Sequence, residues 1–256
     1  DGAAYRHWWV TADRRVHLIG KGVLRFHAVY WPAMLLSAGL PLPTEIVVHD
    51  YLTVDGRKVS KSSGTAVDPT ELVGRYGTDA VRWWLLREVP RVGDVDFSEA
   101  RLVSRADEDL ANGLGNLVNR VVTMVHRYRD GRVPAGATPD AALVEVDHRA
   151  GRGVAAALAA YDFRQAGAAV FQIVIETNRY LERVRPWELA AEGREDEVDD
   201  CLATVVWAGR TLADRLAPFL PGAAAGIASR CAGDPGTGGR LPSPTPLFAR
   251  LAVTTR

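Results

Sequence analysis

The segment that decides the fold of the first part of the chain opens with VHLIG at residues 16–20 and closes with EIVVH at residues 45–49. Both runs are short, apolar and rich in β-branched residues, which predicts two buried strands. Residues 24–38 between them carry apolar side chains at helical spacing; Pro32 predicts a kink, and Gly39 follows where a helix would end. The order strand, helix, strand is typical of a parallel α/β layer. Two strands are too few for a stable sheet, so we expect a part of a larger layer.

Further helices follow this layer. Asp68 and Pro69 are suited to the cap and the first position of a helix that runs to about Glu88. Beyond residue 97 the composition shifts to Ala, Leu, Val, Arg and Glu at helical spacing. This pattern predicts helices over residues 98–129, 141–160, 161–184 and 198–220, with a short helix beginning at Pro186 and Pro221-Gly222 ending the last one. Short connections between such helices are typical of an all-α bundle. Residues 233–246 are rich in Gly, Pro, Ser and Thr and are expected to be irregular.

The composition excludes several classes of protein. The 256 residues contain 31 Lys+Arg and 31 Asp+Glu, so a strongly basic protein that wraps nucleic acid is excluded, although a local basic face is not. No apolar run approaches the length of a membrane span, and the first residues lack the layout of a signal peptide. There is no initiator Met, so we expect the chain to start inside a longer product. Cys201 and Cys231 are isolated, which predicts a reducing, cytoplasmic location and no zinc site.

Lysine is rare, and its placement is informative. Lys21, Lys58 and Lys61 are the three lysines among 31 basic residues, and two of them lie in the loop of residues 54–64, together with three serines and two glycines. The loop follows a predicted strand, and ligands of parallel sheets bind beyond the carboxyl ends of the strands. Compact ammonium groups there are suited to phosphate oxygens. From the residues alone, a solvated loop without a role is the alternative.

The loop and its surroundings resemble a known family. Lys58-Val59-Ser60-Lys61-Ser62 resembles the lysine signature of the class I aminoacyl-tRNA synthetases, and further blocks resemble the methionyl-tRNA synthetases in particular. In chain order, these blocks are residues 17–21, 25–35, 48–56, 109–112, 115–120, 185–188 and 244–248. The resemblance implies a partial Rossmann-type layer with the lysine loop at residues 1–97. It further implies an anticodon-binding helical bundle at 98–231 and an irregular tail at 232–256 that packs back on the protein.

The resemblance also implies an activity and its partners. The expected function is that of a methionine–tRNA ligase, present as a C-terminal fragment that lacks the N-terminal ATP signature and is inactive alone. The implied partners are tRNA(Met), L-methionine, ATP with Mg²⁺, and the missing N-terminal half; a membrane is not among them. The alternatives are a truncated or degenerate paralogue that binds tRNA without aminoacylating it, and a helical interaction protein without a role on RNA.

The resemblance assigns site residues position by position. Lys58, Ser60, Lys61 and Ser62 would form the catalytic loop, in which Lys61 contacts the ATP phosphates. Gly20, His49 and Leu52 would complete the ATP site, and Val23 and His27 would line the methionine side-chain pocket.

Asn116, Arg120, Pro186 and Trp187 match the anticodon-reading positions of the family. Asn116 and Arg120 are four residues apart, so they share one face of a helix. Unpaired bases are read by stacking on aromatic rings and by hydrogen bonds to base edges, and Trp187 and Arg120 can supply both. A core tryptophan is the alternative for Trp187, and a bond to neighbouring backbone is the alternative for Asn116.

The sequence departs from the family at three positions. Gly22 stands where an acid that helps to hold the ribose region is usual, which puts ATP affinity in question. Val59 replaces a usual Met, and Asp50 replaces a usual Gly. Asp50 places an acid near the expected phosphates, which is unfavourable for ATP binding.

Overall fold

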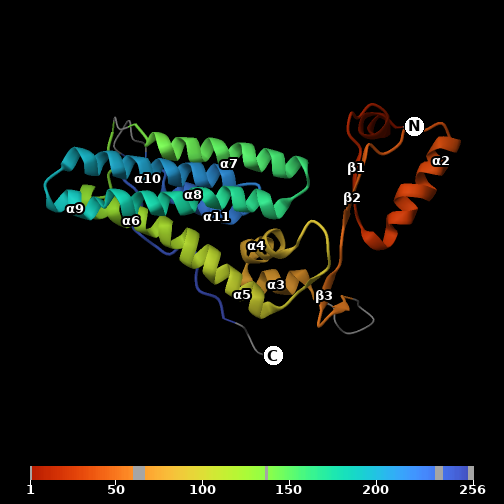
Figure 1. Ribbon diagram of the computed structural model, residues 1–256, viewed down its shortest axis with the longest axis horizontal. Helices are drawn as coiled ribbons and strands as arrows, with labels where there is room; N and C mark the ends of the chain where they lie inside the picture. The colour runs from red at the N-terminus through yellow and green to blue at the C-terminus, as the bar shows by residue number, and fades with distance from the viewer. Residues whose placement is uncertain (1, 60–66, 136–137, 234–238, 253–256) are drawn as a thin grey trace. The chain divides into compact units, whose positions relative to one another are not determined.

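The computed structural model describes residues 2–59, 67–135, 138–233 and 239–252, and the side chain of Lys58 is also left aside (Figure 1). The chain divides into two compact units. One consists of residues 1–66 and 90–97, and the other of residues 67–89 and 98–256.

The first unit contains the predicted parallel pair of strands. Strand β1 (Val16–Gly20) pairs in parallel with β2 (Glu45–His49), so both strand predictions are confirmed. Ahead of β1 lie α1 (Ala3–Tyr5) and the π-helix η1 (Arg6–Val10).

The helix expected at residues 24–38 is present in three successive forms. They are the 3₁₀ turn η2 (Lys21–Val23), the π-helix η3 (Phe26–Tyr30) and the α-helix α2 (Trp31–Ser37). Pro32 lies in the first turn of α2. Since Pro32 has no N–H to donate to the preceding turn, the wide turn of η3 ends just before it and a regular helix restarts there.

A small second sheet was not predicted. Strand β3 (Leu52–Val54) pairs antiparallel with β4 (Arg57–Lys58) and parallel with β5 (Val95–Asp96). Asp55 and Gly56 join β3 to β4 with φ values of 52° and 70°, the geometry of a tight hairpin turn. Strands of two or three residues are too short to carry an alternating pattern, which is why residues 54–58 were expected to form a loop.

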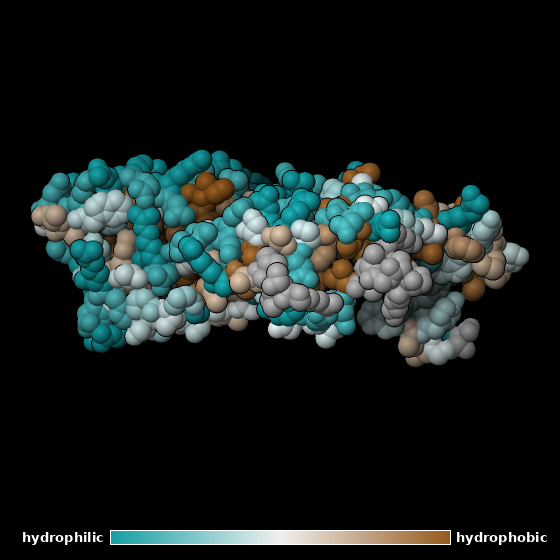
Figure 2. Space-filling model, turned by 90° about the horizontal axis from the view of Figure 1, so that it is seen from below, coloured by the Kyte–Doolittle hydropathy of each residue, from teal (hydrophilic) through white to brown (hydrophobic). Residues whose placement is uncertain are grey.

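Much apolar surface of the first unit is exposed. Ile19 and Leu35 are buried, whereas Trp8, Phe26 and Met34 are 73%, 60% and 62% exposed. Figure 2 shows apolar residues on the face of this unit at the right of the view. The strand pair therefore has few core residues of its own.

The second unit begins with α3 (Pro69–Tyr76) and α4 (Thr78–Glu88). The Asp68 side chain accepts a hydrogen bond from Thr70 N–H, the expected cap. The single helix predicted here is interrupted at Gly77, whose φ of 82° is accessible to glycine without strain.

The helix predicted over residues 98–129 is continuous but changes form. It consists of α5 (Glu99–Arg105), the π-helix η5 (Ala106–Gly115) and α6 (Asn116–Arg129). The π segment is not visible in the apolar spacing, because that spacing marks buried positions and not the hydrogen-bond partner of each N–H.

The bundle is completed by α7 (Ala141–Ala159), α8 (Phe163–Val184), α9 (Pro186–Ala191), α10 (Glu195–Leu216) and α11 (Pro221–Arg230). Helices α7, α8 and α10 lie side by side (Figure 1). Helix α11 was not predicted, because Pro221 was interpreted as ending α10, whereas it occupies the first turn of a new helix. Its Ile227 is completely buried. Among the described residues, no helix is long and apolar enough to cross a membrane.

The compact units divide differently from the domains predicted with a boundary at residue 97. Helix α4 packs on α8 and α5, in the helical unit. Trp83 on α4 stacks on Phe171 of α8 with ring centroids 4.3 Å apart, and its indole N–H donates to Asp109 at 2.9 Å. Trp83 and Trp84 are each 1% exposed, so α4 is a core element of the helical unit.

Candidate functional site

The carboxyl ends of the parallel strands bring two predicted ATP residues together. Gly20 is the register partner of His49, and a Cβ on Gly20 would lie 3.5 Å from the imidazole Cε1. The His49 Nδ1 atom lies 2.9 Å from the carbonyl oxygen of Asp50, and the ring is exposed. Leu52 begins β3 and is half-buried.

An ionic cluster adjoins these strand ends. The Nζ atom of Lys21 lies 3.0 Å from Asp50 Oδ1 and 2.5 Å from Asp94 Oδ1. Asp50 also accepts a hydrogen bond from Gly93 N–H at 2.6 Å, and Asp94 accepts one from Tyr51 N–H at 2.9 Å. Asp50 is therefore paired within the protein, but the Lys21 ammonium balances only one of the two carboxylates, so the acid expected near the phosphates remains.

The cluster shifts the pKa of each member. The hydrogen bonds to Asp94 and Asp50 raise the pKa of Lys21. The N–H of Gly93 and the Lys21 ammonium lower the pKa of Asp50. Lys21, followed by the Tyr51 N–H, lowers the pKa of Asp94. All three groups are thus held in their charged forms.

The space beside Gly22 is filled by a neighbouring side chain. A Cβ at position 22 would overlap the Tyr51 hydroxyl, and the Tyr51 ring centroid lies 4.8 Å from Lys21 Nζ. The Tyr51 hydroxyl therefore stands where the side chain of a residue at position 22 would begin.

The two residues predicted to line the methionine-binding pocket, Val23 and His27, adjoin an aromatic cluster. Val23 is 41% exposed, and its carbonyl oxygen lies 2.9 Å from His27 Nδ1. The ring of His27 is 6.1 Å from that of Trp31, which in turn lies 4.7 Å from His17 and 5.4 Å from Trp9. The cluster of Trp9, His17 and Trp31 was not predicted; the concentration of tryptophans in the first 31 residues was the available signal.

The lysine loop lies largely outside the described residues. The backbone of Lys58 ends β4 opposite Thr53. Ser60, Lys61 and Ser62 fall within the stretch that the structure leaves aside.

Three of the four predicted anticodon residues, Asn116, Arg120 and Trp187, line one groove of about 520 Å³ in the helical unit. Asn116 and Arg120 come from the first turns of α6, and Trp187 comes from the start of α9. The Arg120 guanidinium lies 5.2 Å from the Trp187 ring centroid and 2.8 Å from a carboxylate oxygen of Glu182. Pro186 is buried and opens α9 behind Trp187.

Five further residues line the same groove: Asn119, Thr123, Met124, Arg127 and Tyr128. Thr123 and Arg127 continue the helical spacing of Asn116 and Arg120 along α6, and this spacing is the signal that could have identified them. The groove therefore has a polar helical wall and an aromatic end.

Cys201 on α10 and Tyr180 on α8 are buried titratable groups of the helical core. Burial raises the pKa of the Cys201 thiol to about 11, although the charge of Arg120 acts in the opposite direction. Burial also raises the pKa of the Tyr180 hydroxyl. Neither group is ionised near neutral pH, and the charges in the groove itself are those of Arg127 and of Arg120, which is paired with Glu182.

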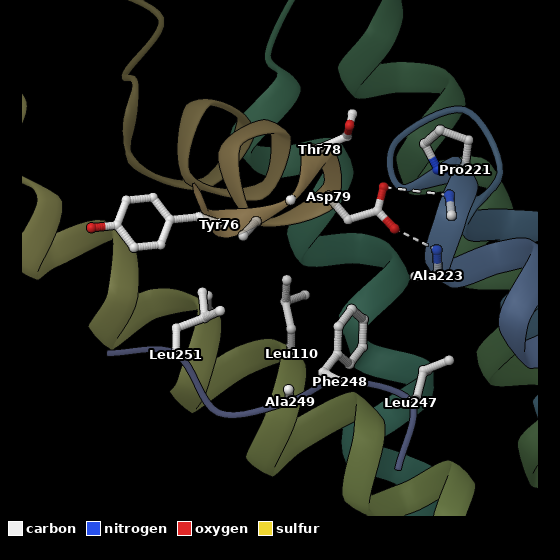
Figure 3. A pocket seen from close by; sticks show the side chains of 14 residues that line it. Tyr76, Thr78, Asp79, Leu110, Pro221, Ala223, Leu247, Phe248, Ala249 and Leu251 are labelled. Carbon is white, nitrogen blue, oxygen red and sulfur yellow. Dashed lines mark hydrogen bonds between the residues drawn. The ribbon is translucent and has the colours of Figure 1, made fainter. Parts of the chain in front are cut away.

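A second hollow of about 560 Å³ contains none of the predicted site residues (Figure 3). Leu110, Leu247, Phe248 and Leu251 line it, with Asp79 at one end. The Asp79 carboxylate accepts hydrogen bonds from the backbone N–H groups at the start of α11, which explains its position as a link between α4 and α11. Among the described residues, no group of three or more His, Cys, Asp or Glu side chains could hold a metal ion.

Comparison with known proteins identifies the class and then the family. The family model described as tRNA synthetases class I (M) matches residues 1–122. The methionine–tRNA ligase of Synechocystis sp. is 42% identical over 218 residues, which are 84% of this chain and 40% of that protein. The methionine–tRNA ligase of Halalkalibacterium halodurans is 38% identical over 268 residues, covering 97% of this chain and 40% of that protein.

Solved structures agree with these relatives. Mycobacterium tuberculosis methionyl-tRNA synthetase in complex with methionyl-adenylate is 35% identical with a TM-score of 0.87, and the match covers 98% of this chain and 52% of that chain. The apo form is 34% identical with a TM-score of 0.84, covering 99% and 52%. The chain belongs to the class I tRNA synthetases and, within them, to the methionyl-tRNA synthetase family. It spans about 40% of the length of the curated relatives described above.

Proposed function

We propose that the chain is part of a methionine–tRNA ligase. In the first step, the carboxylate of methionine attacks the α-phosphorus of ATP, methionyl-adenylate forms and pyrophosphate leaves. In the second step, a ribose hydroxyl at the 3′ end of tRNA(Met) attacks the carbonyl carbon of the adenylate, and AMP leaves. The relatives that are 38% to 42% identical and bear this name support the proposal. The location proposed for the enzyme is the cytoplasm.

The first part of this proposal concerns the partial Rossmann-type layer of residues 1–97. A parallel sheet normally has both of its faces covered. The two parallel strands and the exposed Trp8, Phe26 and Met34 support a layer that further strands and helices of the same enzyme complete.

The ATP site is proposed at the carboxyl ends of β1 and β2. Gly20 leaves room in front of His49, and Leu52 offers an apolar contact to the adenine. Lys61, with Lys58, Ser60 and Ser62, would place ammonium and hydroxyl groups on the phosphates, with Mg²⁺ as a counter-ion. Fixed positive charge on the leaving pyrophosphate lowers the barrier to adenylate formation.

The methionine pocket is proposed beside Val23 and His27. A thioether makes favourable contacts with aromatic rings. The rings of Trp9, His17 and Trp31 beside His27 support a pocket for such a side chain.

The anticodon site is proposed in the groove of the helical bundle at residues 98–231. One observation carries this assignment: the Arg120 guanidinium lies 5.2 Å from the Trp187 ring, in a groove that Asn116 also lines. Trp187 offers a stacking surface for an unpaired base, while Arg120 and Asn116 offer hydrogen bonds to its edge. Pro186 fixes the start of α9, and so the position of Trp187.

Binding to an RNA hairpin tests the anticodon assignment. The chain is titrated with a hairpin that carries the CAU anticodon and with the same hairpin with one anticodon base changed, at two salt concentrations. Preference for CAU that is lost in Trp187→Ala is the expected result, since stacking on an aromatic ring contributes about 1–3 kcal/mol per base. Equal and strongly salt-dependent binding of both hairpins would mean that only the RNA backbone is recognised.

A paralogue that binds tRNA without aminoacylating it is the second candidate. Gly22 favours it, because the position lacks the acid usual in the family and the Tyr51 hydroxyl fills the space. ATP–pyrophosphate exchange by the protein that contains this chain separates the two: methionine-dependent exchange supports the ligase, and its absence beside intact CAU preference supports the paralogue.

A further inference from the structure

We propose that residues 241–251, called here the C-terminal strap, position the base-reading face of α6 by holding the π-helix η5. This inference rests on the proposed anticodon reading. The strap runs beside α6 and η5 on one side of the bundle (Figure 1) and forms a wall of the second hollow (Figure 3).

The element that needs support is η5. Its ten residues, Ala106–Gly115, lie directly before Asn116, the first groove residue of α6. π-helices are rare, and most are single turns within α-helices. Because a π turn contains more residues than an α turn, conversion of η5 to an α-helix would rotate α6 relative to α5.

The strap contacts η5 near its beginning, middle and end. Asp107 accepts a hydrogen bond from the Leu251 N–H at 2.9 Å. The Arg250 guanidinium lies 3.4 Å from the side-chain oxygen of Asn112. The Phe248 ring packs over Gly115. The strap thus spans the whole π-helix.

Gly115 is where the π-helix and the strap constrain the same residue. A Cβ there would lie 3.0 Å from the carbonyl oxygen of Leu110, five residues earlier, and 3.3 Å from the Phe248 ring. Both approaches are tighter than ordinary contacts, so a side chain at this position would displace either the π turn or Phe248. Glycine allows both to be present together.

The other part of the strap is anchored independently of η5. Arg230 on α11 donates hydrogen bonds to the carbonyl oxygens of Thr245 and Pro246 at 3.3 Å and 3.1 Å. Leu247 packs over Gly226, also on α11. Leu247 and Phe248 are therefore adjacent apolar residues of one strap that rest on different helices.

No residue of the strap lines the groove of Asn116, Arg120 and Trp187 among the described residues. Trp187 lies on α9, which packs on α10. The strap can thus affect base reading only through α6, which it holds at η5 and, further along, at His126, whose Nε2 lies 3.1 Å and 2.9 Å from the carbonyl oxygens of Leu241 and Pro242. Phe248 and Gly115 are therefore positioning residues.

The test compares Phe248→Ala with the matched control Leu247→Ala in the full chain. Amide hydrogen exchange is measured over residues 106–120, and the ratio of affinities for the CAU and the base-changed hairpin is measured beside it. Phe248→Ala is expected to speed exchange in this segment and to reduce the affinity ratio about fivefold or more, the scale of coupling between two sites. Leu247→Ala is expected to leave the affinity ratio and the exchange of residues 106–120 as in the unsubstituted chain.

The experiment distinguishes failure of the anticodon assignment from failure of the strap inference. If the unsubstituted chain does not distinguish the hairpins, the anticodon assignment is wrong and the role of the strap is withdrawn with it. If the chain distinguishes them and Phe248→Ala retains the ratio and the exchange, the strap inference alone is overturned. Equal effects of both variants would show a general loss of stability and would also overturn it. Should Phe248→Ala not fold, Phe248→Leu and Gly115→Ala provide the same comparison, with a reduced ratio expected in each.

Discussion

Replacing Arg120 by Lys separates base reading from attraction to the RNA backbone. The substitution keeps a positive charge in the groove and removes the planar guanidinium. The guanidinium lies 5.2 Å from the Trp187 ring centroid and is paired at 2.8 Å with Glu182, an interaction that a lysine ammonium can also make.

The magnitude follows from these contacts. The cation–π contact with Trp187 is present in the free chain and can also be made by a lysine ammonium, so it adds little to the expected change in affinity. Loss of guanidinium hydrogen bonds to a base edge costs about 1–3 kcal/mol. Arg120→Lys should therefore weaken CAU binding by about 1–3 kcal/mol, or roughly 5- to 150-fold.

Fluorescence anisotropy with labelled hairpins measures this effect at several salt concentrations. The base-changed hairpin should lose much less affinity, and the slope of log affinity against log salt should stay unchanged because the charge is kept. Arg152→Lys on α7 is the matched control, since Arg152 is also paired with a carboxylate, at 2.9 Å from Glu145, and lies outside the groove. Equal weakening of both hairpins, or unchanged CAU binding, would refute this account of the groove.

Three further outcomes are expected. The difference in unfolding midpoint between the chain and Lys21→Met should be constant at intermediate pH. It should shrink as pH falls below 3.8 through the lowered pKa values of Asp50 and Asp94, and as pH rises above 10.5 through the raised pKa of Lys21; a difference independent of pH would contradict the cluster. Lys61→Gln in the protein that contains this chain should lower ATP–pyrophosphate exchange by about 100-fold or more without affecting CAU binding, and full exchange activity would remove Lys61 from the ATP site. Ile227→Ala should lower the free energy of unfolding in urea by about 2–5 kcal/mol, because its side chain is completely buried on α11; a loss below about 1 kcal/mol would mean that α11 is not a core element.

The sequence predicted the larger elements because they carry long or strong patterns. The β-branched runs at residues 16–20 and 45–49 are strands, and α8 and α10 follow the expected helical spacing. The strands that were not predicted are too short to carry such a pattern. Strands β4 and β5 contain two residues each, so alternation cannot reveal them.

The backbone hydrogen-bond pattern within a helix could also not be predicted from the sequence. The predicted helix of residues 98–129 contains the π-helix η5, which depends on contacts of Asp107, Asn112 and Gly115 with residues more than 130 positions away. Apolar spacing alone carries no information about such contacts.

The candidate sites differ in how much the sequence alone could provide. Asn116 and Arg120 could be placed on one helical face from their spacing, whereas the approach of Trp187, 67 residues further along the chain, came from the resemblance. The aromatic cluster of Trp9, His17 and Trp31 requires the fold of the strand pair, and the pairing of Lys21 with Asp50 requires the ends of two strands to meet.

Photo-crosslinking shows whether an anticodon base lies in the groove of Asn116, Arg120 and Trp187. A hairpin with 4-thiouridine in place of the uridine of CAU is irradiated with the chain, and the adduct is mapped by mass spectrometry. If the groove reads the anticodon, adducts are expected on α6 between Asn116 and Tyr128 or at Trp187. Unlabelled CAU hairpin should compete them away, whereas the base-changed hairpin should not. Adducts confined to α7, or competed equally by both hairpins, would contradict the anticodon assignment.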